Sequence, residues 1–475
     1  MNFTFRDKTV TREFRLALAQ ALPGLRDNKP HWRFLSYLLF GTYTNDEGQL
    51  MLAREVVAAM EGKVADQHYN ALRFLDEFRA SVLDFEIEDY VLHFDKDQRR
   101  VRTLKSLTLP AEVDALVKAE RRSKGGDRVF MSTGNVCLRK HVSAARKADR
   151  EEAKRRALDK YIAPQTALLL GYMNSLSPNR FTSALRHLPE AMEAAEKLTD
   201  AENQLNLLHT IREHCQPFYI PAEATSRIFA LGASINGLHH DLRAIMSQDW
   251  MTADLKSAQL AIVAKVWGIP ELDEYLRSGR KIWSELTAQI GLPFTPFGKK
   301  IVKDALYAAV YGAGEERMIS DLASALKDTR LKGEQAFRDL KEHAVVKTLL
   351  SARKKQLAKI RSEKGGADAF GRVFTLQYRN VPGKPFQYDN SRSILATVSQ
   401  SYELLILMPI LELALGQQFQ SHGFTVVQWL HDGVSFDVHD KADVNDWMQR
   451  LAPLIKDQAD SLGVNTELEF SRYGE

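Results

Sequence analysis

The chain has 475 residues, of which 44% are hydrophobic and 27% are charged, and its formal net charge is +4. This length and apolar content provide a sizeable core and predict two or three domains. The two cysteines, Cys137 and Cys215, lie far apart in the sequence, which excludes a disulfide framework or a zinc site and favours a reducing, cytoplasmic setting. No stretch approaches the roughly 18 uncharged apolar residues of a membrane span, so we expect no membrane partner.

Residues 1–118 predict an α-rich N-terminal domain. The first stretch, MNFTFRDKTVTREFRLALAQAL, carries charges within its apolar spacing, which indicates an amphipathic helix rather than a signal peptide. Helical apolar spacing recurs at 31–40, 49–62 and 68–82. Two strands follow at 85–94 and 99–107, joined by the turn DKDQ. Three helices and a strand pair fit either a winged-helix module or a helical packing domain with a hairpin, and either could bind a replication, phage or plasmid partner.

Residues 119–215 begin with a basic segment. Between 120 and 160 the chain has thirteen Lys/Arg against six Asp/Glu, a local charge of 13 − 6 = +7. This composition is typical of a linker or arm that neutralises phosphates, and equally of a solvated charged helix. From about 150 to 215 the spacing predicts long helices, including one that spans 189–214.

The stretch MTADLKSAQLAIVAKVWG, residues 251–268, predicts a strand that ends near Asp254, followed by a helix. A carboxylate at the end of a strand can bind a hard cation through its oxygens. The alternative is that Asp254 only caps the helix.

The stretch GLPFTPFGKKIVKDALYAAVYGAG, residues 291–314, predicts a helix capped by Thr295, with Pro296 in its first turn and glycines at its end. Four side chains recur at every fourth residue and therefore share one face: Lys299, Lys303, Tyr307 and Tyr311. Lysines beside aromatic rings fit a triphosphate and a base, whereas a surface helix with buried tyrosines is the plainer interpretation.

The stretch VVQWLHDGVSFDV, residues 426–438, predicts a tight hairpin with Asp432 at its tip. A carboxylate held between two apolar strands is costly unless a positive charge lies near it. The hairpin therefore points to a cation close to Asp432.

Taken in order, a strand-end Asp, a helix reading K-x3-K-x3-Y-x3-YG and a hairpin-tip HD resemble family A DNA polymerases and their relatives, the single-subunit RNA polymerases, over roughly residues 216–475. The resemblance implies an α+β right-hand fold. Its antiparallel-sheet palm would come from 216–290 and 391–475, its helical fingers from 291–390, and thumb-like helices from 119–215.

The resemblance also implies site residues. Asp254, Leu255 and Asp432 would hold two Mg2+ ions, for which Mn2+ can substitute, and Lys303 would grip the triphosphate. The other nucleotide-binding residues implied are Lys299, Tyr307, Tyr311 and Gln259. The primer and template contacts implied are Arg227, Arg392, Gln400, His431 and Gly312.

The sequence departs from the family pattern at three of these places. Gln259 stands where DNA polymerases of the family usually carry Glu beside the sugar 2′ position, Gly433 replaces the usual Glu or Ser after HD, and Lys299 replaces an arginine. We expect a DNA polymerase that extends a DNA primer–template with dNTPs, without a proofreading exonuclease. The alternatives are a single-subunit RNA polymerase or primase-like enzyme, and a catalytically degenerate nucleic-acid-binding replication factor.

Overall fold

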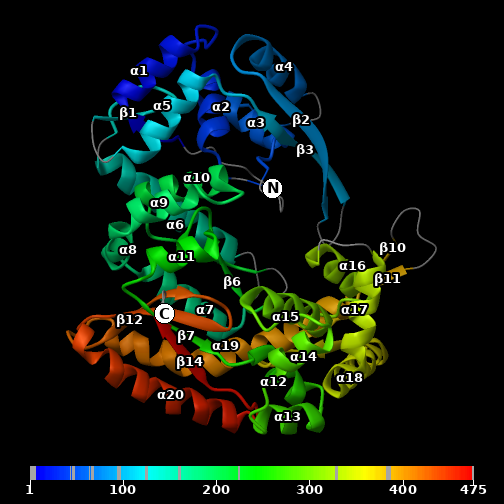
Figure 1. Cartoon of the computed structure of the whole chain (residues 1–475). Coiled ribbons are helices and arrows are strands. Elements are labelled where there is room, and N and C mark those ends of the chain that lie inside the picture. The colour runs from blue at the N-terminus through cyan, green and yellow to red at the C-terminus, as the bar shows by residue number, and fades with distance from the viewer. Residues whose placement is uncertain are drawn as a thin grey trace.

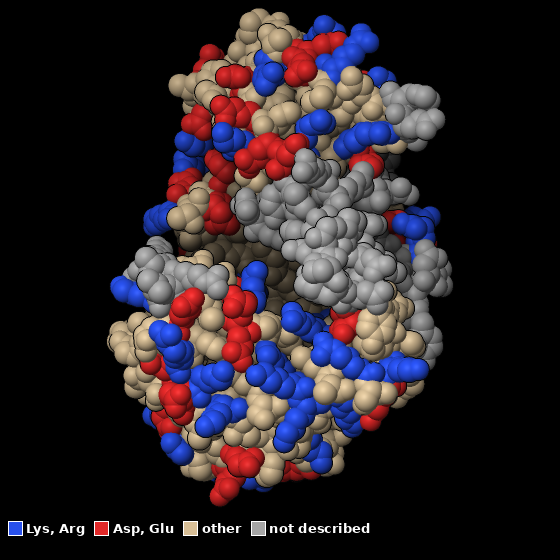
Figure 2. Space-filling model, turned by 90° about the vertical axis from the view of Figure 1, so that its right-hand side faces the viewer, with Lys and Arg blue, Asp and Glu red and all other residues tan. Residues whose placement is uncertain are grey.

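The computed structural model describes residues 7–42, 44, 49–63, 65, 69–93, 98–123, 127–137, 139–158, 162–222, 225–326, 330–380 and 387–472. The protein is α+β, with many helices and small antiparallel sheets. Figure 1 shows the N-terminal residues in the upper part and the C-terminal half of the chain in the lower part. On the side drawn in Figure 2, the surface is hollowed between these two parts.

The upper part, called here the N-terminal body, is built mainly from helices. Its helices are α1 Arg12–Ala21, α2 Lys29–Phe40, α3 Arg54–Glu61, α4 Ala71–Ser81 and α5 Ala111–Arg122. Its strands are β1 Thr9–Thr11, β2 Phe85–His93, β3 Gln98–Leu107 and β4 Arg128–Phe130. The helices predicted within 31–40, 49–62 and 68–82 are confirmed as α2, α3 and α4, and the predicted strand pair is confirmed as β2 and β3.

An isolated β-bridge joins the segment between α2 and α3 to this hairpin. Met51, between α2 and α3, pairs with Thr103 of β3, and the Leu52 N–H donates to the Arg102 carbonyl at 2.7 Å. The structure thus contains the three helices and the strand pair that a winged-helix interpretation requires. The turn predicted at DKDQ lies outside the described residues except for Gln98.

The N-terminal body extends further along the chain than residue 118. That position falls inside α5, and β4 returns to pair with β1 in an antiparallel register of Val10 with Val129. One hydrophobic cluster runs from Val10 to Met131. The compact body therefore ends near residue 131, because β4, which pairs with β1, lies after residue 118 in the chain.

The next segment is helical. It comprises α6 Arg139–Leu158, α7 Pro164–Ser175, a 3-10 turn at Pro178–Phe181, α8 Thr182–Arg186, α9 Leu188–Ala195 and α10 Ala201–Glu213. The side chains of Lys147, Arg150 and Lys154 on α6 are exposed, so this part of the basic segment is a solvated charged helix. The single helix predicted over 189–214 is instead two helices, α9 and α10.

The lower part is organised around one four-stranded antiparallel sheet, called here the C-terminal sheet. Its order is β12 Phe424–Trp429, β13 Gly433–Val438, β7 Met251–Leu255 and β14 Leu468–Arg472. The long helices α19 Ser391–Gln417 and α20 Val444–Ser461 pack together beneath it (Figure 1). The predicted strand at Asp254 and the predicted hairpin at Asp432 are therefore neighbours in one sheet.

The remaining helices form a second lobe beside this sheet (Figure 1). They are α12 Ala258–Val266, α13 Pro270–Arg277, α14 Ile282–Gln289, α15 Pro296–Val310, α16 Glu315–Ala325, α17 Arg330–Glu342 and α18 Ala344–Ser362. A separate hydrophobic cluster, from Leu260 to Leu395, holds this lobe together.

Short elements complete the lower part. The paired strands are β5 Tyr219–Pro221 with β6 Ile228–Ala230, β8 Gly365–Ala367 with β9 Val373–Thr375, and β10 Tyr378–Asn380 with β11 Gln387–Asp389. Helix α11 His240–Met246 and the 3-10 turns Ile235–Gly237 and Lys441–Asp443 lie between longer elements.

Helix α19 is the one described helix long and apolar enough to cross a membrane. Two thirds of its most apolar window, 67%, is buried inside the protein. It packs against α12, α18, α20 and β12. This is typical of the core helix of a soluble protein.

Candidate active site

Strand β7 separates apolar from polar side chains, as a sheet with one covered face requires. Met251, Ala253 and Leu255 are buried, whereas Asp254 points to the open face. Gly433 of β13 lies directly opposite Asp254 in the register. A Cβ at position 433 would stand 1.9 Å from the Asp254 Oδ1 atom, so only glycine leaves room for this carboxylate.

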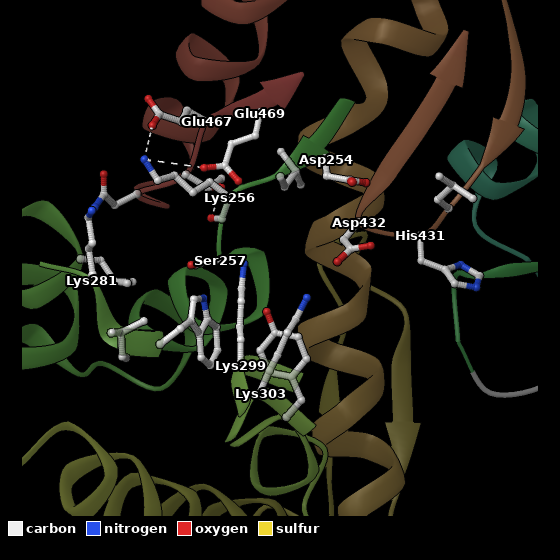
Figure 3. Close-up of a pocket in the computed structure, with 18 of the residues that line it drawn as sticks. Asp254, Lys256, Ser257, Lys281, Lys299, Lys303, His431, Asp432, Glu467 and Glu469 are labelled. Atoms are coloured by element: carbon white, nitrogen blue, oxygen red, sulfur yellow. Dashed lines mark hydrogen bonds and ion pairs between the residues drawn. The ribbon is translucent and has the colours of Figure 1, made fainter. Parts of the chain in front are cut away.

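Asp432 lies in the tight connection between β12 and β13. Its backbone carbonyl accepts a hydrogen bond of 2.8 Å from the Leu255 N–H, which fastens the hairpin tip to the end of β7. His431 reaches this turn with a positive φ of 74°, a conformation that costs free energy for a residue other than glycine. The two aspartates are 432 − 254 = 178 positions apart in sequence, yet they line the same pocket and their carboxylates face each other (Figure 3).

Burial and the proximity of Asp432 change the acidity of Asp254. Burial and the nearby charge of Asp432 together raise the pKa of Asp254 to about 6, although the charge of Lys303 opposes both effects. Although the Asp254 side chain stays accessible to water, protein surrounds the pocket on most sides. Carboxylate oxygens suit a hard divalent cation. Leu255 could contribute to such a site only through its backbone carbonyl oxygen.

Helix α15 forms as its sequence predicts. The Thr295 Oγ1 accepts a hydrogen bond of 3.1 Å from the Gly298 N–H, and Pro296 is the first helical residue. Gly312 follows the helix with a φ of +85°. One face, including Ile301, Val302, Ala305 and Leu306, is buried in the lobe.

The opposite face of α15 turns toward the aspartates. Lys299, Lys303 and Tyr307 line the same pocket as Asp254 and Asp432, and both lysines extend into it from α15 (Figure 3). The Lys303 Nζ atom lies 5.2 Å from the centroid of the Tyr307 ring, within the range of a cation–π interaction. The structure thus brings together the two predicted carboxylates and three of the four predicted side chains of the helix.

The pocket has a volume of about 950 Å3, within the range of sites that hold a small molecule. Apart from α15, its cations include Arg243, Lys256 and Lys281. Of these three, Lys256 forms ion pairs with Glu467 at 2.8 Å and with Glu469 at 3.9 Å (Figure 3). A pocket with cations around two carboxylates can accept a polyphosphate together with divalent metal ions.

Four of the five predicted primer and template residues do not line this pocket: Arg227, Arg392, Gln400 and Gly312. Gly312 packs against Arg392, and a Cβ on Gly312 would stand 2.9 Å from the Arg392 Cβ atom. The Tyr311 hydroxyl lies 3.5 Å from the Arg227 Nη2 atom. Gln400 is 9% exposed.

His431 lines the pocket and its ring packs edge-on against Phe229, with 5.3 Å between ring centroids. Burial, with the charge of Arg227, lowers its pKa to about 4. The ring is therefore neutral near pH 7. A neutral imidazole can donate or accept a hydrogen bond without adding charge to the site.

Gln259 does not line the pocket. It is 1% exposed, is not among the lining residues, and donates a hydrogen bond from Nε2 to Glu403. Glu403, on α19, was not predicted as a site residue. The sequence offers one signal for Glu403: it is a single carboxylate within the otherwise largely apolar run of residues 402–411. A carboxylate at such a core position needs a buried partner.

Two other groups of described residues could share a metal ion: His239, His240 and Asp241, and His422, Asp440 and Asp443. Their side chains are exposed or half-buried, and neither group includes Asp254 or Asp432. None of the six residues lines the pocket described above.

No protein-family model matches the chain, and no curated protein matches it. The chemistry of the pocket is therefore inferred from its own residues: one carboxylate on β7 and one in the β12–β13 turn, a helix face with two lysines and a tyrosine, and a neutral histidine.

Proposed function

We propose that this protein is a template-directed DNA polymerase, similar to those of family A, that adds dNTPs to a primer 3′-hydroxyl. The observation that supports it most is that Asp254, Asp432 and Lys303 line one pocket although they come from β7, the β12–β13 turn and α15. Nucleotidyl transfer needs divalent ions at the reacting phosphate and a fixed positive charge on the departing one. The pocket contains side chains for both tasks.

In this proposal the molecule is a right hand. The C-terminal sheet with α12–α14, α19 and α20 is the palm, α15–α18 are the fingers, and α6–α10 are thumb-like helices. The ends of β7 and of the β12–β13 hairpin carry the carboxylates, and α15 presents its lysines to them (Figure 3). The N-terminal body is an additional domain for a nucleic-acid end or a partner protein.

Each residue has a distinct task in this mechanism. Asp254 and Asp432, with the carbonyl of Leu255, hold Mg2+ or Mn2+, and bound ions of this kind supply charge that stabilises the attacking and leaving oxygens. Lys303 and Lys299 neutralise the triphosphate and orient it. Tyr307 and Tyr311 pack against the incoming base pair, and Arg227, Arg392, Gln400 and the neutral His431 position the primer and template.

The test is primer extension with Mg2+ and dNTPs, compared between the wild type and Asp432→Asn. We expect the variant to bind primer–template as the wild type does and to lose extension, because an amide binds a divalent cation much more weakly than a carboxylate. The matched control is Asp440→Asn in the second His–Asp pair of the chain, which is exposed and caps a 3-10 turn. Wild-type extension by Asp432→Asn contradicts the proposal.

A second candidate, a single-subunit RNA polymerase or primase-like enzyme, is favoured by one observation: residue 259 is an amide whose side chain is drawn away from the pocket. Running the assay separately with dNTPs and rNTPs, with and without a primer, distinguishes the two enzymes. Absence of incorporation under every condition favours the degenerate nucleic-acid-binding factor instead.

A further inference from the structure

Glu403 is a buried carboxylate at the meeting point of three segments. It lies on α19, is 1% exposed, and contacts Gln259 of α12 and Arg227, the residue before β6. A charged group so deeply buried requires partners that satisfy its oxygens. Both oxygens are satisfied here.

The contact with Arg227 is a fork. The Arg227 Nε donates to Glu403 Oε2 at 3.2 Å, and Nη2 donates to Oε1 and Oε2 at 3.1 and 2.8 Å. A two-point pair of this kind fixes the orientation of both side chains. The carboxylate plane of Glu403 is therefore set by Arg227, independently of Gln259.

This fixed carboxylate determines the position of Gln259. The Gln259 amide presents its Nε2 to Glu403 and donates a hydrogen bond to the Oε1 atom. The Gln259 Oε1 atom is then left buried without a hydrogen-bond partner among the described residues. An unsatisfied acceptor is unfavourable, so the bond to Glu403 is what keeps the amide in this place.

The hydrogen bond to Glu403 thereby keeps the Gln259 side chain out of the pocket lining. Ser257 and Tyr307 line the pocket, whereas Gln259, two residues after Ser257, does not. Besides burial, the groups that influence the pKa of Glu403 are Arg227, Asp432 and Gln259. The charge of Glu403 in turn helps to raise the pKa of Tyr307 and of Tyr311. Glu403 is thus close enough to Tyr307 and Tyr311 to influence both side chains.

We infer that Glu403 holds Gln259 back from the nucleotide pocket, so that the sugar 2′ position is open and ribonucleotides are accepted beside deoxyribonucleotides. The inference rests on the proposed polymerase function and specifies its substrate class. Glu403 is a positioning residue, since it acts through Gln259 and contacts no substrate itself. A site rejects an extra hydroxyl only where a group blocks or mispairs it, and a retracted amide does neither.

The experiment measures kcat/KM for a dNTP and for the matching rNTP on one primer–template, and compares their ratio among variants. For the wild type we expect a preference for dNTP below about tenfold, and for Gln259→Ala a ratio within about threefold of it, because a retracted side chain blocks nothing. Gln259→Glu places a second carboxylate beside Glu403. Repulsion should turn it toward the pocket and raise the preference for dNTP at least about tenfold.

The double variant Gln259→Glu/Glu403→Gln removes that repulsion, since Arg227 and the new amide can both bind the carboxylate at 259. Its ratio should return to within about threefold of the wild type. The control is Glu412→Gln, an exposed position on the same helix, which should leave the ratio unchanged. A merely structural role for Glu403 would lower kcat/KM equally for both sugars and leave every ratio the same.

Two outcomes overturn the inference while the polymerase function stands: a wild type that prefers dNTP by more than about a hundredfold and loses this preference in Gln259→Ala, or a Gln259→Glu variant with the wild-type ratio. A wild type that incorporates neither nucleotide refutes the proposed function itself, and the inference with it. If the double variant does not fold, the two single substitutions at position 259 decide the question.

Discussion

Gly433 and Asp254 are direct neighbours across β13 and β7, and the space that a Cβ of residue 433 would occupy is taken by the Asp254 carboxylate. A larger residue at 433 must therefore displace that carboxylate or the strand that carries it. The absence of a side chain at 433 is a condition for the placement of Asp254.

Gly433→Ala should consequently lower the rate of primer extension by about 100-fold, since a displacement of about 1 Å at a reacting centre has an effect of this size. Steady-state kcat/KM for the nucleotide is the measurement. Gly416→Ala, on α19, is the control because a Cβ there meets nothing within 4 Å. Full activity of Gly433→Ala would mean that Asp254 does not need its present position.

Lys303→Ala should lower kcat/KM for the nucleotide by about 10²–10³-fold, the usual loss when one fixed positive donor is removed from developing charge. Lys300 on the same helix provides the control, because its side chain is exposed, pairs with Asp304 and does not line the pocket. Lys300→Ala should extend primers at the wild-type rate. Similar losses in both variants would indicate damage to α15 rather than a missing charge in the pocket.

Asp254→Asn should make the metal-free protein more stable at pH 8 and have little effect near pH 4. The folded-state pKa of Asp254, about 6, lies above its ordinary value of 3.8, so the folded protein holds this proton more tightly than the unfolded chain does. Its contribution to stability is present below pH 3.8 and is lost as the pH rises through 6. Asparagine remains neutral and avoids that loss.

Thermal unfolding midpoints of the two proteins, measured in a chelator between pH 4 and 8, test this expectation. Added Mg2+ should raise the midpoint of the wild type at pH 8, because binding to the folded state alone stabilises it. It should raise the midpoint of Asp254→Asn much less. A difference between the two proteins that does not change with pH would exclude a raised pKa at Asp254.

The elements of the site were predictable where their signals are local. Thr295, Pro296 and Gly312 fix the two ends of α15, and the spacing of its lysines and Tyr307 fixes their common face. The strand before Asp254 and the hairpin around Asp432 follow from apolar runs interrupted by polar residues. In each case the residues that determine the helix, strand or hairpin lie within it or next to it in the sequence.

Features that depend on a distant neighbour could not be predicted in this way. The role of Glu403 arises only where α12, α19 and Arg227 meet, and the need for glycine at 433 arises only because β13 pairs with β7. The extension of the N-terminal body to Met131 likewise depends on β4 pairing with β1 across more than a hundred residues. Pairings of this kind leave no pattern in a short window of sequence.

The final prediction concerns the basic surface of α18. Seven of the residues from 344 to 364 are Lys or Arg and one is acidic, and Figure 2 shows cations gathered over the lower part of this side of the molecule. The side chains of Lys347, Lys354, Lys355 and Lys359 are exposed. If template passes over this surface, Lys347→Ala/Lys355→Ala should weaken binding uniformly across sequences and reduce the slope of log K against log salt by about 1–2.

Fluorescence anisotropy of labelled primer–template between 50 and 200 mM salt, roughly the range over which such contacts are lost, measures this slope. Lys265→Ala/Lys441→Ala changes the net charge equally at two exposed positions that line no part of the pocket, so it separates a local contact from a general effect of charge. Equal slopes for the α18 variant and the wild type would show that the template follows another path. Because these substitutions leave Asp254, Asp432 and Lys303 in place, single-turnover rates at saturating template should remain those of the wild type.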